Sequence, residues 1–412
     1  MAATDLSPRS GRSALRHRGY RLFWAARFLA VLGHQIVGVA VGRQVYDLTR
    51  NPFDLGLVGL VQFAPALMLV LVTGTVADRF NRRLIVALGL LTEGVCAATV
   101  LVLTATGTVT VGAIFLVLFC FGTARAFANP AMQSLIPNLV PAEDLAGAIA
   151  LSASSWQVAT IAGPLAGGLL YGLAAEAAYG TAMALFVAAT AFIALVPRPR
   201  QKTVPEPATW TTVVAGFRYV WHEKIVLGAV SLDLFAVLLG GAYALMPAYA
   251  RDILVVGPWG LGLLRSAPSL GALLVALYLS ARPIRDRAGL VMFLAVALFG
   301  VAIVVFGLST TVWLSIAALA VAGAGDMISV YVRETLIQLW TPDAVRGRVN
   351  AVNMVFVGGS NEVGEFRAGT VAALIGIVPA VVVGGIGTVI VAGLWAWWFP
   401  GLRRVRHLAG RA

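Results

Sequence analysis

Charged residues are scarce in this 412-residue chain: Asp, Glu, Lys and Arg make up 12% of it, while 59% is hydrophobic. Soluble domains contain about 25% charged residues, so this composition excludes a soluble globular protein. Apolar stretches of about 18 or more residues, long enough to cross a bilayer core, recur along the whole chain. The sequence therefore predicts an integral membrane protein.

Lysine, histidine and cysteine are also scarce, and each shortage counts against a class of chemistry. The two lysines, Lys202 and Lys224, follow no glycine-rich phosphate loop, which counts against ATP hydrolysis. The four histidines are scattered and no G-x-S-x-G motif occurs, so we expect no enzyme and no cofactor. Cys96 and Cys120 lie inside apolar stretches, so we expect neither a disulfide nor a metal site.

The apolar stretches predict an all-α membrane protein with twelve transmembrane helices in two pseudo-symmetric six-helix bundles. We expect a tail over 1–19, a bundle over 20–196, a linker with an amphipathic surface helix over 197–224, a bundle over 225–399 and a tail over 400–412. The predicted spans are 20–46, 53–77, 84–105, 109–130, 145–172, 178–196, 225–249, 259–281, 288–308, 311–332, 350–375 and 378–399.

Positive charge predicts how the chain crosses the membrane. Lys and Arg gather in both tails, the central linker and alternate loops, whereas the opposite loops contain only Arg50 and Arg251. This bias predicts that both termini are cytoplasmic. The basic residues are thereby explained by topology, and no nucleic-acid partner is expected. Arginine is much more frequent than lysine in this chain, and alanine and glycine are abundant. This amino-acid usage indicates a bacterial source, and hence a location in the inner membrane.

The two halves of the chain repeat each other. Gly59, Ala64 and Pro65 in the second span align with Gly262, Ala267 and Pro268 in the eighth, and Gly122 aligns with Gly323. Such repeats are typical of transporters whose substrate path lies between two halves.

The loop after the second span reads Gly74-Thr-Val-Ala-Asp78-Arg79-Phe-Asn-Arg82-Arg83. A glycine allows a close helix contact, the aspartate accepts bonds from basic groups or a helix N-terminus, and arginines suit anionic lipid headgroups. This spacing resembles the signature loop of the major facilitator superfamily. The resemblance implies a role for these residues in conformational change.

The fifth span contains Gly163-Pro164-Leu-Ala-Gly167-Gly168, which is similar to a motif of exporters in that superfamily. Small residues on one helix face let a neighbouring helix approach closely, and Pro164 bends the helix. Packing alone is the alternative explanation of these glycines.

Similarity to the enterobactin-exporter branch of the superfamily extends over residues 15–408. The segments that carry it are 231–241, 249–254, 257–268, 341–353 and 360–366. It implies export of a siderophore or related small molecule by alternating access, powered by protons. The expected partners are therefore a small molecule, protons and membrane lipids, with a monomer as the default. A multidrug/proton antiporter, a lipid or lysolipid translocator and a non-transporting sensor remain alternatives.

The resemblance implies that spans 1, 4, 7 and 10 line a central cavity, and these spans contain Arg27, Arg125, Asp233 and Asp326. Charges inside a membrane are costly and usually functional. We expect a cytoplasmic gate whose ion pairs form and break, with protonation of the aspartates coupling protons to transport. A permanent structural ion pair is the alternative.

Glu362 and Glu365 are three residues apart in span 11 and should share a helix face. They are candidates for binding protons or a cationic group, or else they bond to Arg367 or nearby backbone.

Four further ionisable side chains are candidates of a different kind. His34 is a possible proton relay or substrate ligand, with a hydrogen-bonded structural histidine as the alternative. Arg43 and Arg265, near the predicted periplasmic ends of their spans, are candidates for attracting an anionic substrate, or else extend to the interface. Glu93 in span 3 is a weaker candidate for function.

Overall fold

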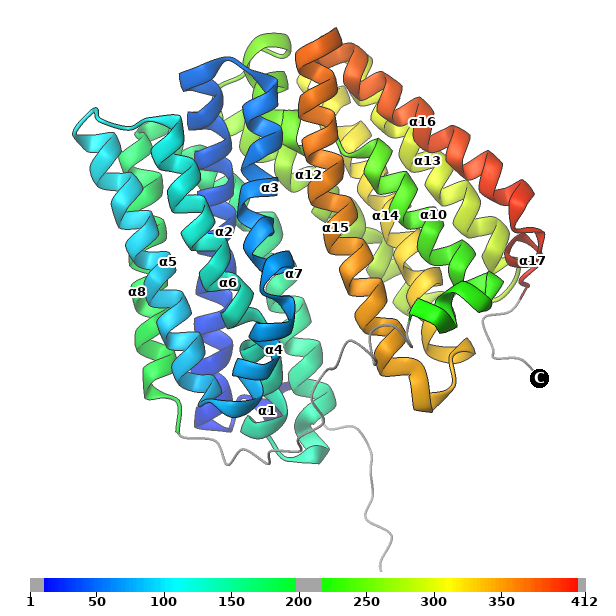
Figure 1. Ribbon diagram of the computed structural model, residues 1–412, viewed down its shortest axis with the longest axis horizontal. Coiled ribbons are helices and arrows are strands. Elements are labelled where there is room, and N and C mark those ends of the chain that lie inside the picture. The colour runs from blue at the N-terminus through cyan, green and yellow to red at the C-terminus, as the bar shows by residue number, and fades with distance from the viewer. Residues whose placement is uncertain (1–10, 198–216, 407–412) are drawn as a thin grey trace, which may run out of the picture. The chain divides into compact units, whose positions relative to one another are not determined.

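The computed structural model describes residues 11–197 and 217–406, and within these ranges all regular structure is helical (Figure 1). The predicted all-α membrane fold is confirmed. Between the short helices α1 (Gly11–Ala14) and α17 (Pro400–Arg403), the helices of the first half are α2 (Arg18–Thr49), α3 (Pro52–Met68), α4 (Val70–Arg79), α5 (Arg82–Ala105), α6 (Val111–Leu139), α7 (Ala142–Leu173) and α8 (Ala175–Leu195).

The second half begins with α10 (Lys224–Gly240), after a helical stretch at residues 217–222. Three short elements follow: the 3₁₀-helix η1 (Tyr243–Leu245), α11 (Met246–Ala248) and the π-helix η2 (Tyr249–Ile253). The remaining long helices are α12 (Pro258–Ala281), α13 (Ala288–Leu308), α14 (Val312–Trp340), α15 (Asp343–Ile375) and α16 (Ile377–Trp398). Most of the expected amphipathic linker helix falls on residues 198–216, outside the described ranges.

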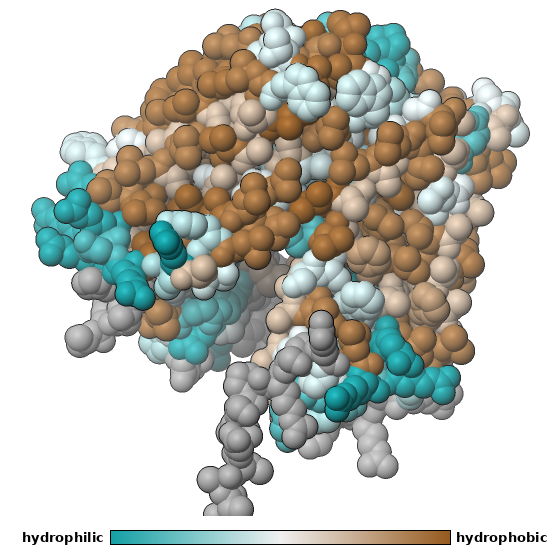
Figure 2. Space-filling model, turned by 180° about the vertical axis from the view of Figure 1, so that it is seen from behind, coloured by the Kyte–Doolittle hydropathy of each residue, from teal (hydrophilic) through white to brown (hydrophobic). Residues whose placement is uncertain are grey.

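Ten spans in the described part of the chain are long and apolar enough to cross a membrane. The second predicted span is divided at Leu69 into α3 and α4, and the eleventh, α15, contains Glu362, Glu365 and Arg367. Figure 2 shows broad areas of apolar side chains on the surface, with hydrophilic ones gathered in smaller patches. Leu116 and Trp313 are among the exposed apolar residues, at 67% and 75%. Lipid is the solvent that suits such a surface.

The described helices form two compact units. The first contains the described parts of Met1–Gln44 and Val61–Ala208, and the second contains Val45–Leu60 with the described part of Thr209–Ala412. The end of α2 and the start of α3 therefore belong, by their contacts, to the second unit. In the first unit α5 packs against α6 and α8, and in the second α13 packs against α14 and α16 (Figure 1).

Glycines bring helices together at corresponding places in the two units. A Cβ on Gly122 of α6 would overlap the carbonyl oxygen of Gln62 in α3. A Cβ on Gly323 of α14, its counterpart in the sequence repeat, would overlap the carbonyl oxygen of Pro268 in α12. The same backbone approach thus occurs in both halves, as expected from a duplicated sequence.

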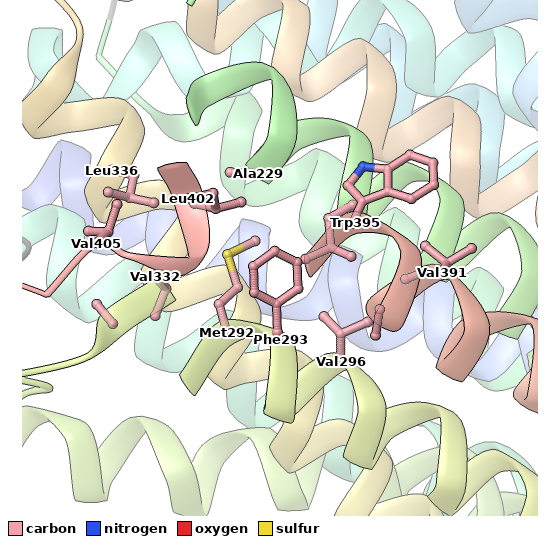
Figure 3. Packing of buried hydrophobic residues seen from close by; sticks show 14 residues of the cluster. Ala229, Met292, Phe293, Val296, Val332, Leu336, Val391, Trp395, Leu402 and Val405 are labelled. Carbon is pink, nitrogen blue, oxygen red and sulfur yellow. The ribbon is translucent and has the colours of Figure 1, made fainter. Parts of the chain in front are cut away.

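A hydrophobic core in the second unit joins α13, α16 and the segment after them. Met292, Phe293 and Val296 of α13 pack with Trp395 of α16 and with Leu402 (Figure 3).

The segment that follows α17 then caps the start of α13. The amides of Ala288 and Gly289 donate to the carbonyl oxygens of Arg406 and Val405, at 3.2 and 3.1 Å. The C-terminal segment therefore satisfies backbone donors that the first turn of α13 leaves open.

Besides the division of the second span, further details differ from the sequence prediction. Helices α6 and α14 continue to Leu139 and Trp340, past the predicted ends at 130 and 332. The seventh span, predicted as one apolar run, breaks after Gly240. Hydropathy does not reveal such a break, because the residues on both sides of it are apolar.

The close approach at Gly122 generates a test of the packing. Gly122→Ala is expected to lower thermal stability in detergent, because overpacking typically costs about 1–3 kcal/mol. Gly112→Ala on the same helix is the control, since a Cβ there meets nothing within 4 Å. The measurement is the midpoint of thermal unfolding of each purified variant. Equal midpoints for the two variants would contradict the close contact with Gln62.

Candidate functional site

The break in the seventh span is held by side chains of two other helices. Arg367 of α15 donates from Nε to the carbonyl oxygen of Leu238 at 2.8 Å and from Nη2 to that of Leu239 at 2.5 Å. Thr388 of α16 donates to the carbonyl oxygen of Ala236 at 3.0 Å. Carbonyl groups that lose their helical partners inside a membrane need such donors. Arg367 therefore binds backbone at the break.

Gly241 and Gly364 let α15 approach the break. A Cβ on Gly241 would lie 3.1 Å from the carbonyl carbon of Gly364, and one on Gly364 would lie 2.9 Å from the carbonyl oxygen of Val237. This contact brings the middle of α15 close to the broken helix. Discontinuous membrane helices commonly form the binding sites of transporters.

The two glutamates of α15 share a face, as their spacing predicted, and they meet α3. A Cβ on Gly59 would overlap Oε2 of Glu362 and lie 3.3 Å from Oε2 of Glu365. Both glutamates are only half-buried. The absence of a side chain at Gly59 thus leaves room for two neighbouring carboxylates inside the second unit.

Other polar groups of the second unit lie within electrostatic range of Glu365. Arg265 of α12 and the hydroxyl of Tyr243 in η1 both interact with it, and Tyr243 also interacts with Asp326 of α14. The Nε of Arg265 is buried with no hydrogen-bond partner among the described residues. We define these five residues as the acidic site: Arg265, Asp326, Tyr243, Glu362 and Glu365.

Asp233 has a partner that sequence reasoning missed. It forms an ion pair with Arg333 of α14, and the two side chains are 6% and 3% exposed. Asp326 interacts with both members of the pair. The predicted tenth span ended at 332, which placed Arg333 outside the membrane. Its position seven residues after Asp326, on the same face of one helix, was the available signal.

Three candidate arginines lie in the first unit, and each has different neighbours. Arg27 interacts with Tyr20 on its own helix, and Arg43 interacts with Tyr171 of α7. The Nε of Arg125 is buried with no hydrogen-bond partner in residues 11–197 and 217–406. The expected four-charge gate stays a prediction.

His34 and Glu93 meet inside the first unit. The imidazole Nε2 lies 3.0 Å from Oε2 of Glu93, between α2 and α5. The sequence indicates both residues separately but not their contact, because the rotation of two helices about their axes decides it.

The signature loop binds backbone at helix ends. Arg82 donates from Nε to the carbonyl oxygen of Ala77 at 3.1 Å and from Nη1 to that of Ser134 at 3.4 Å. Arg83 donates from Nη1 to the carbonyl oxygen of Val196, after α8, at 2.6 Å. Cations at helix C-termini are favourable, because the last carbonyl groups have no partner within the helix.

Two other residues of the signature loop have open space around them. Arg79 is exposed, and a Cβ on Gly74 would meet nothing within 4 Å. The side chain of Asp78 lies outside the described part of the structure.

The glycines of the exporter-like motif bring α7 against α2. A Cβ on Gly163 would overlap the side chain of Gln35, and one on Gly167 would lie 3.0 Å from the Cα of Ile36. Pro164 and Gly168 are buried beside them. The motif serves close packing in this structure.

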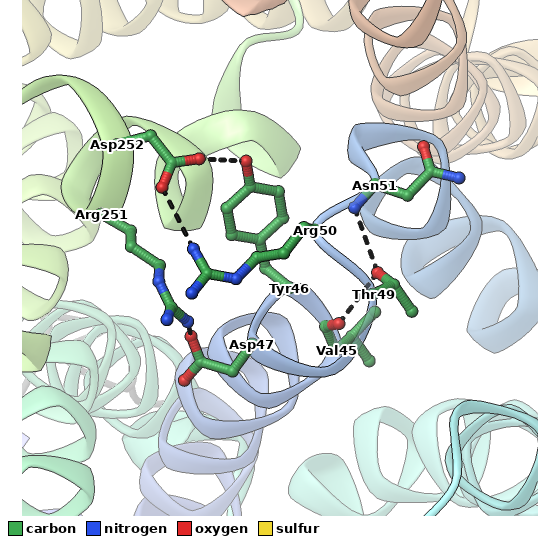
Figure 4. Close-up of polar contacts among 8 residues, drawn as sticks. All are labelled: Val45, Tyr46, Asp47, Thr49, Arg50, Asn51, Arg251 and Asp252. Carbon is green, nitrogen blue, oxygen red and sulfur yellow. Dashed lines mark hydrogen bonds and ion pairs between the residues drawn. The ribbon is translucent and has the colours of Figure 1, made fainter.

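A second ionic cluster joins the end of α2 to η2 (Figure 4). Asp47 pairs with Arg251, and the hydroxyl of Tyr46 donates to Asp252. Arg50 Nη1 also lies 3.4 Å from Oδ1 of Asp252. The two basic residues of the predicted periplasmic loops are thus neutralised by acids within the second unit.

No group of three or more His, Cys, Asp and Glu residues in the described ranges has the arrangement of a metal site. Cys96 and Cys120 are free thiols.

Known proteins resemble this chain along nearly its whole length. The family described as transmembrane secretion effector matches residues 9–405. The chain is 27% identical over 403 residues to the enterobactin exporter EntS of Citrobacter koseri and of Shigella boydii serotype 18, covering 95% of this chain and 94% of each relative.

Solved structures show the same fold at much lower sequence identity. A bacterial homolog of the human lysosomal transporter Spinster superimposes with a TM-score of 0.75 at 13% identity, covering 94% of this chain and 97% of that one. The nucleoside transporter NupG superimposes with a TM-score of 0.67 at 16% identity, covering 92% and 99%.

The buried pair of Asp233 and Arg333 generates a stability prediction. Arg333→Gln is expected to destabilise the protein by roughly 3–5 kcal/mol, because it leaves Asp233 buried without a counter-charge. Adding Asp233→Asn should restore much of the loss. Thermal unfolding midpoints in detergent measure both effects, with the exposed Arg404→Gln as control. A double variant no more stable than Arg333→Gln would contradict the pairing.

Proposed function

The chain belongs to the transmembrane secretion effector family of the major facilitator superfamily, and we propose that it is a proton-coupled exporter of a small, siderophore-like or amphiphilic molecule. Its relatives support a membrane transporter of a small molecule. The coupling ion, the direction of transport and the identity of the substrate are proposed. We place it in a bacterial inner membrane with both termini in the cytoplasm, from the distribution of Lys and Arg.

The observation that carries the proposal is the acidic site beside the broken helix. Glu365 lies within electrostatic range of Glu362, of the Arg265 guanidinium and of the Tyr243 hydroxyl, and Tyr243 also interacts with Asp326. Ionisable side chains are costly inside a membrane, so they are kept where they bind ions or substrate. Their half-buried state leaves them open to a ligand.

The chemistry of the site suits a ligand with both polar and apolar parts. Arg265 can bind an anionic or phenolic oxygen, while Glu362 and Glu365 can accept hydrogen bonds or hold protons. A site for lipophilic cations alone has no need of Arg265. The mixture of charges therefore favours a siderophore-like molecule over the substrates of a multidrug pump.

Proton coupling requires that protonation favours one conformation over another. Asp326 lies in electrostatic range of both Asp233 and Arg333. A proton on Asp326 therefore changes the net charge of these three side chains. A neutral Asp326 leaves one aspartate to pair with one arginine. An ionised Asp326 places two negative charges near a single positive one, which favours rearrangement.

Uptake of iron-free enterobactin into inside-out membrane vesicles tests the function. We expect accumulation that depends on an imposed proton gradient and disappears when an ionophore collapses it. Glu365→Gln should lower accumulation about tenfold or more, because a lost charged contact in a buried site costs at least ~1.4 kcal/mol. The exposed Glu143→Gln is the matched control.

The outcomes of this assay separate the alternatives. No uptake by the wild-type protein overturns the siderophore-like substrate, and the same vesicles are then offered cationic drugs and lysolipids. Uptake that persists without a gradient overturns proton coupling but leaves transport.

A second variant tests the coupling residue. Asp326→Asn is expected to abolish gradient-driven accumulation while enterobactin still exchanges across the membrane, because the amide cannot lose a proton. Radiolabelled substrate measures both processes. Full gradient-driven uptake in Asp326→Asn and in Asp233→Asn would show that neither aspartate couples protons.

A further inference from the structure

The first unit contains a buried histidine–glutamate pair that the proposed function does not use. The Nε2 of His34 and Oε2 of Glu93 lie 3.0 Å apart, and the side chains are 19% and 1% exposed. Neither atom has another hydrogen-bond partner within residues 11–197 and 217–406. Each group therefore depends on the other for its charge or its proton.

Aromatic rings hold the imidazole in place. Its centroid lies 5.3 Å from that of Phe121 and 5.2 Å from that of Phe186, both edge to face, and the two phenyl rings lie 5.8 Å apart. A Cβ on Gly33 would also lie 3.0 Å from the Phe186 ring. The orientation of His34 toward Glu93 is thus fixed by packing from α6 and α8.

One thiol is a titratable neighbour of the pair. Cys96 on α5 interacts with Glu93 and with Cys120 on α6. Other charged or titratable side chains on the surrounding helices have partners of their own: Arg27 interacts with Tyr20, Arg43 interacts with Tyr171, and Tyr179 donates to Gln44. Arg125 lies one turn beyond Phe121, with its Nε in no hydrogen bond among described residues.

A small apolar cavity lies beside Cys96 and Phe121, which neighbour Glu93 and His34 respectively. A cavity of about 10 Å³, hardly room for one water, is lined by Cys96, Phe121, Tyr179 and seven residues with apolar side chains, among them Val37 and Val41. An apolar cavity of this size stays dry. Exchange with solvent therefore passes through the partly exposed imidazole.

We propose that His34 and Glu93 form a proton-binding site of the first unit, which takes up and releases one proton during the transport cycle. This inference rests on the proton coupling of the proposed function. Imidazole is the side chain that ordinarily exchanges a proton near neutral pH. With one proton between them the two groups are neutral as a pair, whereas its loss leaves an uncompensated buried carboxylate.

The cost of that charge makes proton release depend on conformation. In the structure described here the Glu93 side chain is only 1% exposed, so an ionised carboxylate without a counter-charge is costly there. A conformation that hydrates the imidazole and Glu93 lowers the cost and lets the proton pass from Nε2 to water. Binding and release on opposite sides of the membrane would then contribute one proton to each cycle.

Infrared difference spectroscopy tests proton binding without any substrate. Spectra of the protein in proteoliposomes are compared between about pH 5 and about pH 8, the range in which histidine ordinarily titrates. We expect carboxyl and imidazole bands that disappear in Glu93→Gln and change in His34→Gln. Glu176→Gln, a half-buried glutamate of α8, should keep them. Wild-type and Glu93→Gln spectra that coincide would overturn the site.

Transport then separates coupling from a structural role. In vesicles with iron-free enterobactin, both variants are expected to lower the ratio of gradient-driven accumulation to gradient-free exchange by about 5-fold to 150-fold, the usual range of coupling between two sites. A merely structural pair would lower both rates together and leave the ratio unchanged, which contradicts the proposal.

The two measurements fail independently. Infrared bands that depend on Glu93, in a protein that does not accumulate enterobactin, would support the proton site and overturn the proposed substrate. Gradient-driven accumulation by a protein without those bands would support the exporter and overturn the proton site.

Discussion

A bilayer offers no water to the peptide groups inside it, so every carbonyl that a helix break releases needs a donor from the protein. This constraint governs the second unit. The span that begins with α10 ends its regular helix at Gly240, and Arg367 supplies donors to the released carbonyl oxygens of Leu238 and Leu239. The break can therefore exist in lipid, and it places Tyr243 near the carboxylates of α15.

The same scarcity of water explains how each unit treats its buried charges. Asp233 forms an ion pair with Arg333 within the second unit, and Glu93 lies against the imidazole of His34 within the first. An arginine stays charged at any ordinary pH, whereas a histidine does not. The two pairs are therefore different devices: one holds its charge permanently, and the other can change it.

The all-α membrane fold, the approximate position of most spans and the shared face of Glu362 and Glu365 follow from sequence, because apolar length and helical spacing determine them. The sequence does not reveal which residues pair with the buried charges. The pairing of Asp233 with Arg333 depends on which helices are neighbours and how each is rotated, and α14 also continues past its apolar stretch. The break after Gly240 is equally hidden, since its stabilising donor, Arg367, lies more than a hundred residues away in the chain.

The first turn of α13 receives its backbone partners from Val405 and Arg406, and Leu402 fills the core beside Met292. This end of the chain is thus an integral piece of the second unit. For recombinant work, a purification tag or fluorescent reporter joined beyond Arg406 leaves that contact intact. A chain that ends before Leu402 would instead expose the α13 core to detergent and leave the amides of Ala288 and Gly289 without these partners. The position at which a tag is joined therefore influences the yield of folded protein.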